Sequence, residues 1–425
     1  MKKSIYNIVQ KINETYYVIF NSYGGVIKLL TLEQYAEYET GKKLNCFPYY
    51  VEDDLDEMKI VQQERDAYIN ATKDYIRFTI LPTLKCNANC SFCFENTYGR
   101  KTMSENDIEQ TVFYIKSKAI QYKKLRIHWF GGEPMVARPI IYIITEQLYE
   151  FCKSNRISYK ACIGTNLSLI NDNNYKNLID DLHIDTIEFA FDGIEKQHNN
   201  VKSYNNSSFD AFSHNLHMLD VLLNSNVTVV VRFNSNKSNY DDLLMLSDIL
   251  CARYKDYQNF NPYLAVIVPT DLYKDTHNLI LPQEYAFYYL PFFHVLQKNG
   301  AGMEVYPLHR NANFCYGTNP NSIVIGSDGV LTKCIASPSA ESQSIGTIWS
   351  GVKKNNIYKK WIFDHLINEC RQCPIFPLCL GGCTNDYLFK SISPCKKEKF
   401  YLQELLIDAG RYMIEHSIDE FLFSK

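Results

Sequence analysis

Hydrophobic and polar positions divide this chain into three regions with different patterns. Residues 1–73 open with the short β-like runs SIYNIVQKI, TYYVIFN and GVIKLL, followed by helical patterns at about 32–40 and 53–72. Residues 74–304 alternate between strand-like and helix-like segments. Residues 305–425 are rich in cysteine and turn residues and end with a helical pattern at about 398–415. We therefore expect three domains with these boundaries.

The middle region repeats one strand–helix unit. Its apolar strand candidates are YIRFTIL (75–81), LRIHWF (125–130), YKACIG (159–164), TIEFAF (186–191), VTVVVRF (227–233) and YLAVIV (263–268). One helix between them is expected to start at Ser104, where Asp107 completes a capping-box-like pattern. Apolar strands that alternate with helices predict an α/β fold with a parallel sheet covered by helices. Six units, rather than the eight of a closed barrel, predict a partial (β/α)6 barrel of the TIM type.

Charge and hydropathy limit the partners. The net charge is −3 and the pI is about 6.4, so the chain has no basic footprint for nucleic acid. The segment MKKSIYNIVQKINETYYVIF lacks the unbroken apolar stretch of a signal peptide. No apolar run approaches the roughly 18–20 residues of a membrane span. We expect a cytoplasmic protein that binds neither nucleic acid nor membrane.

That compartment changes how the 14 cysteines are interpreted. Disulfides are rare in a reducing cytoplasm, so closely spaced cysteines indicate metal binding. Most of the cysteines fall into two tight groups. The scattered ones are expected to be small buried hydrophobic residues: Cys46, Cys152, Cys162 and Cys251.

The first group lies in TLKCNANCSFCFE, directly after the first strand of the middle region, and contains Cys86, Cys90 and Cys93. A structural zinc site takes four ligands, and no fourth is nearby in the sequence. Three thiolates on a 4Fe–4S cluster would leave one iron open to a non-protein ligand. The C-x3-C-x2-C spacing resembles the signature of the radical S-adenosylmethionine superfamily, and Phe92 fits the aromatic residue commonly found before its last cysteine.

The second strand ends in HWFGGEP, at the side of a barrel where chemistry is assembled. This sequence is similar to the family motif that holds the methionyl amino group of S-adenosylmethionine. The resemblance implies that Gly131 and Gly132 let the backbone approach the ligand and that Glu133 is an anionic partner for the ammonium. It also implies ribose and carboxylate contacts at later strand ends, where ordinary turn and capping roles stay open: Thr165-Asn166, Asp192-Gly193, Arg232 and Asn234.

The second group has seven cysteines, with Gly329 between the first two. A zinc ribbon would explain four of them but not seven. The spacing resembles the SPASM extension of radical enzymes that modify peptides and proteins. The resemblance implies an outer auxiliary 4Fe–4S cluster on Cys370, Cys373, Cys379 and Cys395, and an inner one on Cys315, Cys334 and Cys383. Three thiolates leave an iron of the inner cluster without a cysteine, and His309, water or a substrate thiolate are the candidates for it.

The two resemblances together imply an enzyme that binds three 4Fe–4S clusters and S-adenosylmethionine. They also imply a partner that supplies single electrons, such as flavodoxin or ferredoxin. The expected reaction starts with hydrogen abstraction by a 5′-deoxyadenosyl radical. The expected substrate is a ribosomally made precursor peptide, in which the enzyme installs a crosslink, and we favour a thioether over a carbon–carbon bond.

The N-terminal region looks like the leader-recognition modules of such peptide maturases. Its acidic run at 52–57 is expected either to contact a basic leader or to be a solvated helix start.

Two alternatives stay open. An anaerobic sulfatase-maturating enzyme forms formylglycine and typically has an Asp after the second SPASM cysteine, where this chain has Ile335. A non-catalytic iron–sulfur electron carrier or zinc scaffold would need neither the GGEP sequence nor an open iron.

Overall fold

The computed structural model describes the chain except for residues 42–47, 96–98, 205–207, 269–272, 274, 309–314, 338–339, 364–367, 391–392, 394, 396–397 and 424–425. Its contacts divide the chain into two compact units. One contains Thr72–Ile280 and Tyr316–Phe363, and we call it the sheet unit. The other contains Met1–Ala71, Leu281–Cys315 and Asp364–Lys425, and we call it the terminal unit.

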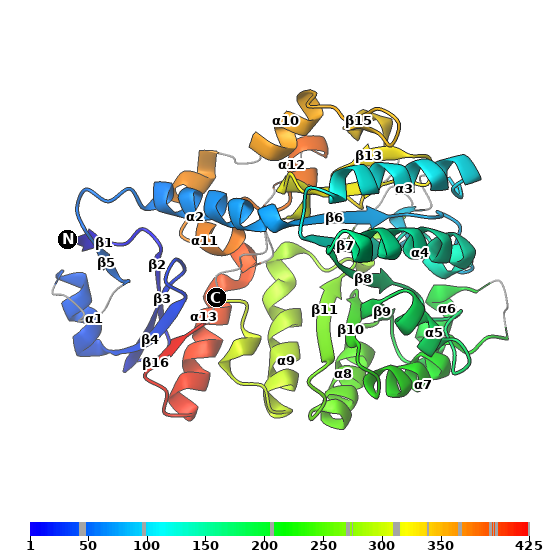
Figure 1. Cartoon of the computed structure of the whole chain (residues 1–425). Coiled ribbons are helices and arrows are strands. Elements are labelled where there is room, and N and C mark those ends of the chain that lie inside the picture. The colour runs from blue at the N-terminus through cyan, green and yellow to red at the C-terminus, as the bar shows by residue number, and fades with distance from the viewer. Residues whose placement is uncertain are drawn as a thin grey trace. The chain divides into compact units, whose positions relative to one another are not determined.

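The sheet unit is built on one ten-stranded sheet (Figure 1). In spatial order its strands are β11 (Phe260–Val266), β10 (Thr228–Ser235), β9 (Ile184–Phe191), β8 (Ser158–Gly164), β7 (Lys124–Trp129), β6 (Tyr75–Ile80), β12 (Ser322–Ile325), β13 (Val330–Thr332), β14 (Gly346–Thr347) and β15 (Gly351–Val352). Strands β6 to β11 are parallel to their neighbours in chain order, as the strand–helix pattern predicts. In the described residues the sheet is open at β11 and β15, which agrees with a partial rather than a closed barrel.

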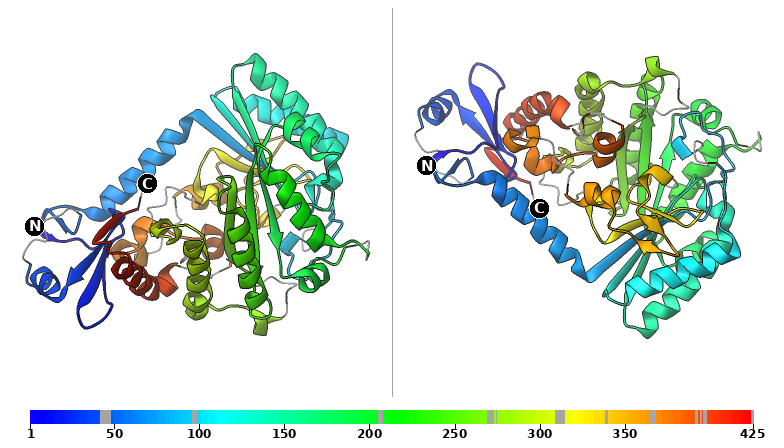
Figure 2. Two further views of the ribbon diagram at one scale, coloured as in Figure 1. Left: turned by 90° about the horizontal axis from the view of Figure 1, so that it is seen from below. Right: turned by 90° about the horizontal axis from the view of Figure 1, so that it is seen from above.

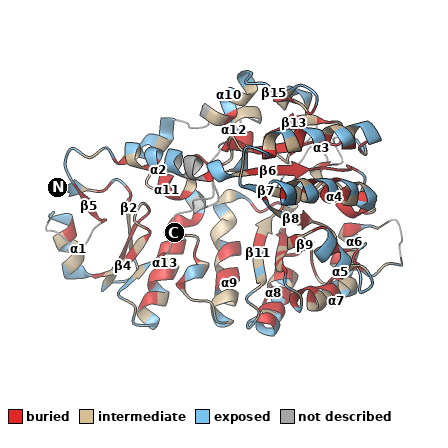
Figure 3. Ribbon diagram, in the orientation of Figure 1, coloured by how far each residue is buried: buried red, intermediate tan, exposed pale blue. Residues whose placement is uncertain are grey.

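Helices cover one face of this sheet (Figure 2). They are α3 (Glu105–Ala119), α4 (Arg138–Ser154), α5 (Tyr175–Asp181), α6 (Glu195–Lys202), α7 (Ala211–Leu223) and α8 (Tyr240–Tyr254). Alternate strand residues such as Ile127, Ile187 and Val231 are fully buried, so the sheet has one apolar face (Figure 3). The expected capping box is confirmed, because Ser104 and Asp107 exchange side-chain and backbone hydrogen bonds at the start of α3.

The sheet extends beyond the six expected strands. Strand β12 pairs in parallel with β6, with Ser322 opposite Arg77 and Ile325 opposite Ile80. All four residues of β12 are buried. A short apolar strand of the cysteine-rich region thus covers what would otherwise be an exposed edge at β6. The hairpin strands β13 to β15 and helix α10 (Asn356–Phe363) follow in the same unit.

The terminal unit joins both ends of the chain. Its four-stranded antiparallel sheet has the order β16 (Glu420–Leu422), β4 (Val26–Thr31), β3 (Tyr16–Asn21) and β2 (Asn7–Lys11), and a small pair joins β1 (Lys2–Lys3) to β5 (Tyr50–Val51). Its helices are α1 (Leu32–Glu39), α2 (Glu57–Ala71), α9 (Tyr285–Lys298), α11 (Phe376–Cys379), α12 (Thr384–Phe389) and α13 (Glu398–Glu415). The N-terminal strands and helices and the last helix lie close to where the sequence pattern predicts them.

The N-terminal sheet shares its core with the C-terminal helix. A Cβ atom added to Gly410 of α13 would lie 2.3 Å from the Cδ1 atom of Ile12. Strand β16 adds to the edge of β4, with Phe421 opposite Ile27. Residues 1–71 therefore depend on residues 398–423 for part of their packing.

Candidate functional site

The first cysteine group lies in the loop after β6, and this loop is held by hydrogen bonds at its base. The Leu84 amide donates to the Lys101 carbonyl at 2.8 Å, and the Cys93 amide donates to the Cys90 carbonyl at 3.2 Å. Burial raises the pKa of the Cys86 thiol to about 11 and that of the Cys90 thiol to about 12. Neighbouring thiols add to both pKa shifts: Cys93 raises the pKa of Cys86, and both other cysteines raise the pKa of Cys90.

Three thiols in one loop could hold a 4Fe–4S cluster. In the described parts of the chain, no three His, Cys, Asp or Glu side chains lie close enough together to hold one metal ion. A 4Fe–4S cluster spreads its thiolates over different irons, so its ligands lie further apart than those of one ion. The raised pKa of Cys86 and of Cys90 means that metal binding through their thiolates would release protons.

The GGEP sequence after β7 packs against the base of the cysteine loop. A Cβ atom on Gly131, where φ is +117°, would lie 2.4 Å from the Thr83 carbonyl oxygen. A Cβ atom on Gly132 would lie 2.5 Å from the Lys85 carbonyl oxygen, and the Glu133 amide donates to that oxygen at 3.0 Å. The sequence predicts an approach of these glycines to a ligand; the structure shows an approach to the loop that contains the cysteines.

The Glu133 carboxylate is fully buried and accepts three hydrogen bonds. They come from the Thr165 hydroxyl at 2.8 Å, the Asn166 amide at 2.7 Å and the Met135 amide at 3.0 Å. Burial raises the pKa of Glu133, and these donors oppose that shift. Glu133 thereby joins the end of β7 to the end of β8.

The end of β8 in turn reaches the cysteine loop. The side-chain amide of Asn166 donates to the Asn87 side-chain oxygen at 3.0 Å and lies 3.8 Å from the Cys86 sulfur. The Asn87 amide donates to the Ser168 hydroxyl at 2.8 Å. The loops after three adjacent strands thus form one hydrogen-bonded network. Sequence reasoning missed Asn87 and Ser168, although Asn87 directly follows the first cysteine.

Asp192, after β9, is fully buried and lies in a second network. Its carboxylate is 3.1 Å from the Lys202 ammonium and accepts a hydrogen bond from the Asn234 side chain at 2.8 Å. Burial alone would raise the pKa of Asp192, but Lys202 holds it below its usual value. The Lys202 carbonyl accepts from the Asn89 amide at 3.1 Å, so this ion pair braces the middle of the cysteine loop. Lys202 carries no motif, and sequence reasoning did not identify it.

The remaining predicted residues lie around this edge of the sheet. Phe92 packs against a buried cluster of Ile267, Tyr273 and Leu279. Arg232 lies opposite Tyr263 of β11, and its Nε atom is buried without a hydrogen-bond partner in the described residues. Glu95, which sequence reasoning did not consider, is a buried carboxyl whose pKa is raised to about 8 by burial and by Glu133.

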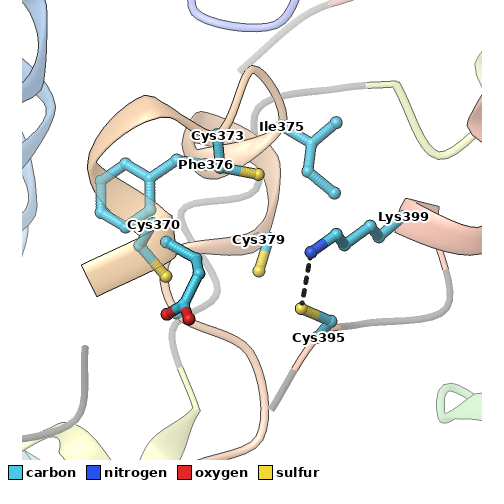
Figure 4. A pocket seen from close by; sticks show the side chains of 9 residues that line it. Cys370, Cys373, Ile375, Phe376, Cys379, Cys395 and Lys399 are labelled. Carbon is cyan, nitrogen blue, oxygen red and sulfur yellow. Dashed lines mark hydrogen bonds between the residues drawn. The ribbon is translucent and has the colours of Figure 1, made fainter. Parts of the chain in front are cut away.

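In the terminal unit, four of the seven later cysteines line one pocket (Figure 4). They are Cys370, Cys373, Cys379 and Cys395, the same four that the SPASM resemblance assigns to one cluster. The first two lie at the turn Asn368–Gln372 and just after it, the third ends α11, and the fourth precedes α13. Four soft thiols around one pocket fit an iron–sulfur cluster.

The other three cysteines are divided between the units. Cys315 and Cys383 belong to the terminal unit, whereas Cys334 follows β13 in the sheet unit. Burial raises the pKa of Cys383 to about 11, and Cys315 is close enough to add to that shift. His309 lies outside the described residues.

These features define an α/β protein with a three-cysteine site at the carboxyl edge of a parallel sheet. Residues 80–271 match the model of the Radical SAM superfamily. The chain therefore contains a radical SAM domain.

Solved structures share this fold. Native anSMEcpe with bound AdoMet and a Cp18Cys peptide is 18% identical, with a TM-score of 0.60 over 79% of this chain and 99% of that one. SuiB of Streptococcus suis bound to S-adenosylmethionine is 15% identical, with a TM-score of 0.51 over 93% of this chain and 98% of that one. At these identities the likeness concerns the fold.

One curated relative, an uncharacterized protein of Methanocaldococcus jannaschii, is 29% identical over 115 residues. The match spans 27% of this chain and 37% of that relative. Within the described residues, no helix is long and apolar enough to cross a membrane.

Proposed function

We propose that this chain is a radical S-adenosylmethionine peptide maturase that installs a crosslink in a ribosomally made precursor peptide. The observation that carries the proposal is the network that joins Cys86, Glu133 and Asn166 from the ends of β6, β7 and β8. Cys86, Cys90 and Cys93 would hold the first 4Fe–4S cluster. When reduced and with S-adenosylmethionine bound, that cluster would supply one electron to cleave the cofactor into methionine and a 5′-deoxyadenosyl radical, which would abstract a substrate hydrogen.

Glu133 has the properties of an ammonium-binding group. A carboxylate offers about four lone-pair sites, and three are used by the Thr165, Asn166 and Met135 donors. One site is left for a cationic donor such as the methionyl amino group. An ammonium there would also offset the cost of keeping this carboxylate charged inside the protein.

Asn166 would act on the thiolate side of the same site. Its side-chain amide already lies 3.8 Å from the Cys86 sulfur, and a donor at a metal-bound thiolate stabilises the negative charge on sulfur. Gly131, Gly132, Phe92, Asp192 and Arg232 complete our assignment for cofactor binding. Asp192 would support cofactor binding through Lys202, which it holds against the cysteine loop.

The later cysteines would hold two auxiliary clusters, in the sets that the sequence suggests. The pocket shared by Cys370, Cys373, Cys379 and Cys395 supports the outer set. The inner set of Cys315, Cys334 and Cys383 lacks a fourth cysteine. A substrate thiolate at that position would place sulfur near the reacting carbon, and for this reason we favour a thioether product.

A peptide substrate is supported by anSMEcpe, which shares the fold and was solved with a bound peptide. We assign leader recognition to the N-terminal sheet of the terminal unit. A flavodoxin- or ferredoxin-type reductant and a cytoplasmic location complete the proposal.

Formylglycine formation is the second candidate, because anSMEcpe is among the structures with this fold. The residue after Cys334 counts against it. Ile335 packs against the buried side chains of Leu81, Leu84 and Val324, so an apolar contact occupies the position of the expected acid.

The test is anaerobic reconstitution followed by measurement of 5′-deoxyadenosine after addition of S-adenosylmethionine and dithionite. The wild type and a Cys152→Ala control should release it, because Cys152 is buried in α4, outside the loop. The triple variant Cys86→Ala, Cys90→Ala, Cys93→Ala should release none. A wild type that binds iron but never cleaves S-adenosylmethionine would instead identify an electron carrier.

Mass spectrometry of the precursor distinguishes the products. A thioether removes two hydrogens and protects one cysteine from alkylation. Loss of two hydrogens with every cysteine still alkylated would support a carbon–carbon bond, and conversion of one Cys or Ser to an aldehyde would support formylglycine formation.

A further inference from the structure

Lys399 is a charged side chain at the outer cysteine pocket to which the proposed function gives no role. It lies in the first turn of α13, and its side chain points into the pocket (Figure 4). Its ammonium donates a hydrogen bond to the Cys395 sulfur at 3.3 Å. Glu369, directly before Cys370, lines the same pocket and is its acidic member.

A cation in contact with a cluster ligand has a definite electrostatic effect. Reduction adds one negative charge to a cluster that four thiolates already make anionic. A donor to sulfur and a nearby positive charge both stabilise the reduced form, and so raise the reduction potential. Lys399 is exposed, so solvent and salt screen its charge at longer range, but a direct contact with sulfur is screened least.

We infer that Lys399 sets the reduction potential of the cluster proposed at Cys370, Cys373, Cys379 and Cys395, holding it above the value that the four thiolates alone would give. Glu369 acts in the opposite direction. The inference rests on the proposed function for the ligand set. Lys399 touches a cluster ligand and not the substrate, so its effect is on electron affinity at this site.

The test is a potentiometric titration of the reconstituted full-length protein, followed by electron paramagnetic resonance. Lys399→Gln should lower the equilibrium constant for one-electron reduction of one cluster by at least about tenfold, which is about 59 mV for a one-electron couple. The other two clusters should keep their potentials and serve as internal controls. Lys399→Arg keeps the charge and the N–H donors, and should stay close to the wild type.

Two further variants distinguish the effect of a charge that lines the pocket from the effect of any nearby charge. Glu369→Gln should shift the same cluster upward. Arg371→Gln removes an exposed cation next to Cys370 in the sequence. Arg371 is not among the described residues that line the pocket, so this change should leave the reduction potential unchanged. Iron, sulfide and absorbance are measured for every variant, so that cluster loss is not mistaken for a shift.

An unchanged potential in Lys399→Gln, with the outer cluster present, would overturn the inference. Equal shifts in Lys399→Gln and Arg371→Gln would overturn it as well, because diffuse charge would then be sufficient. If the wild type itself lacked the outer cluster, the proposed function would fail at this site, and not the role of Lys399. In that case the iron count would be low and the ligand assignment itself would be wrong.

Discussion

The two cysteine regions present their thiols by different structural means. The loop with Cys86 and Cys90 is tied to the ends of β7 and β8 through Glu133 and Asn166, and to the end of α6 through the backbone of Lys202. Among the described residues of the outer pocket, the backbone–backbone bonds around the cysteines are short-range, such as those from the Cys373 amide to the Cys370 carbonyl and from the Cys379 amide to the Ile375 carbonyl. The Ser22 hydroxyl adds one longer-range bond, to the Pro374 carbonyl. The first site is thus formed by the fold, and we expect the second to depend more on a bound cluster.

Phe376 is the main exception to this contrast. It is buried with Tyr6 and Val61 and anchors α11, and Cys370 and Cys373 pack against the same group. The outer pocket therefore has an apolar foundation on one side.

The largest expected effect comes from the first region. Cys86→Ala, Cys90→Ala, Cys93→Ala should abolish cleavage of S-adenosylmethionine and leave the protease resistance of residues 72–280 unchanged, because strands and Glu133 hold the loop. Limited proteolysis with mass spectrometry measures this. New cleavage sites within the loop would mean that the cluster, and not the fold, orders it.

The matching change in the outer pocket should behave in the opposite way. Replacing Cys370, Cys373, Cys379 and Cys395 by Ser should remove about four irons per chain and expose residues 368–390 to protease. Uncoupled release of 5′-deoxyadenosine should persist, since other thiols hold the first cluster. If this variant were as protease-resistant as the wild type, the contrast between the regions would be wrong.

The ion pair beneath the first loop should contribute to stability. Lys202→Met leaves the buried Asp192 charge without its partner and should lower the free energy of unfolding by about 3–5 kcal/mol. Adding Asp192→Asn should recover part of that loss, because no buried charge is then left unpaired. Chemical denaturation of the wild type, Lys202→Met and the double variant measures both effects. If Lys202→Met were as stable as the wild type, the bracing role of the ion pair would be refuted.

A smaller effect is expected at Glu133. Glu133→Gln keeps the shape but loses the charge, and should weaken S-adenosylmethionine binding about tenfold, which corresponds to about 1.4 kcal/mol. Equilibrium dialysis under anaerobic conditions gives the affinity. The exposed Glu146→Gln on α4 is the control and should bind as the wild type does.

The sequence predicted the parallel strands well because the middle region alternates apolar strands with amphipathic helices, and the Ser104 capping box is entirely local. The sequence did not predict β12, because four apolar residues within a cysteine-rich region do not indicate which strand they would pair with. Lys202 was missed because its partner Asp192 precedes helix α6 in the sequence while Lys202 ends that helix, and only the folded chain brings the two together. The sequence singles out the glycines of GGEP for contact with a ligand, whereas their nearest neighbours in the structure are the backbone of the cysteine loop.

The structure also changes one experiment that the sequence suggests. Deleting residues 1–72 would appear to remove a separate leader-recognition module. It would in fact remove β4, the pairing partner of β16, and uncover α13 at Gly410. Point variants on the exposed face of the N-terminal sheet are therefore the better test of leader binding.

The central claim is that both cysteine regions hold iron–sulfur clusters. The most direct test is quantification of iron, sulfide and zinc in the anaerobically reconstituted full-length chain, together with Mössbauer spectroscopy. The account predicts about twelve irons and about twelve sulfides per chain, all in 4Fe–4S clusters. A plateau near four irons would remove both auxiliary sites, and stoichiometric zinc in place of iron would contradict the whole account.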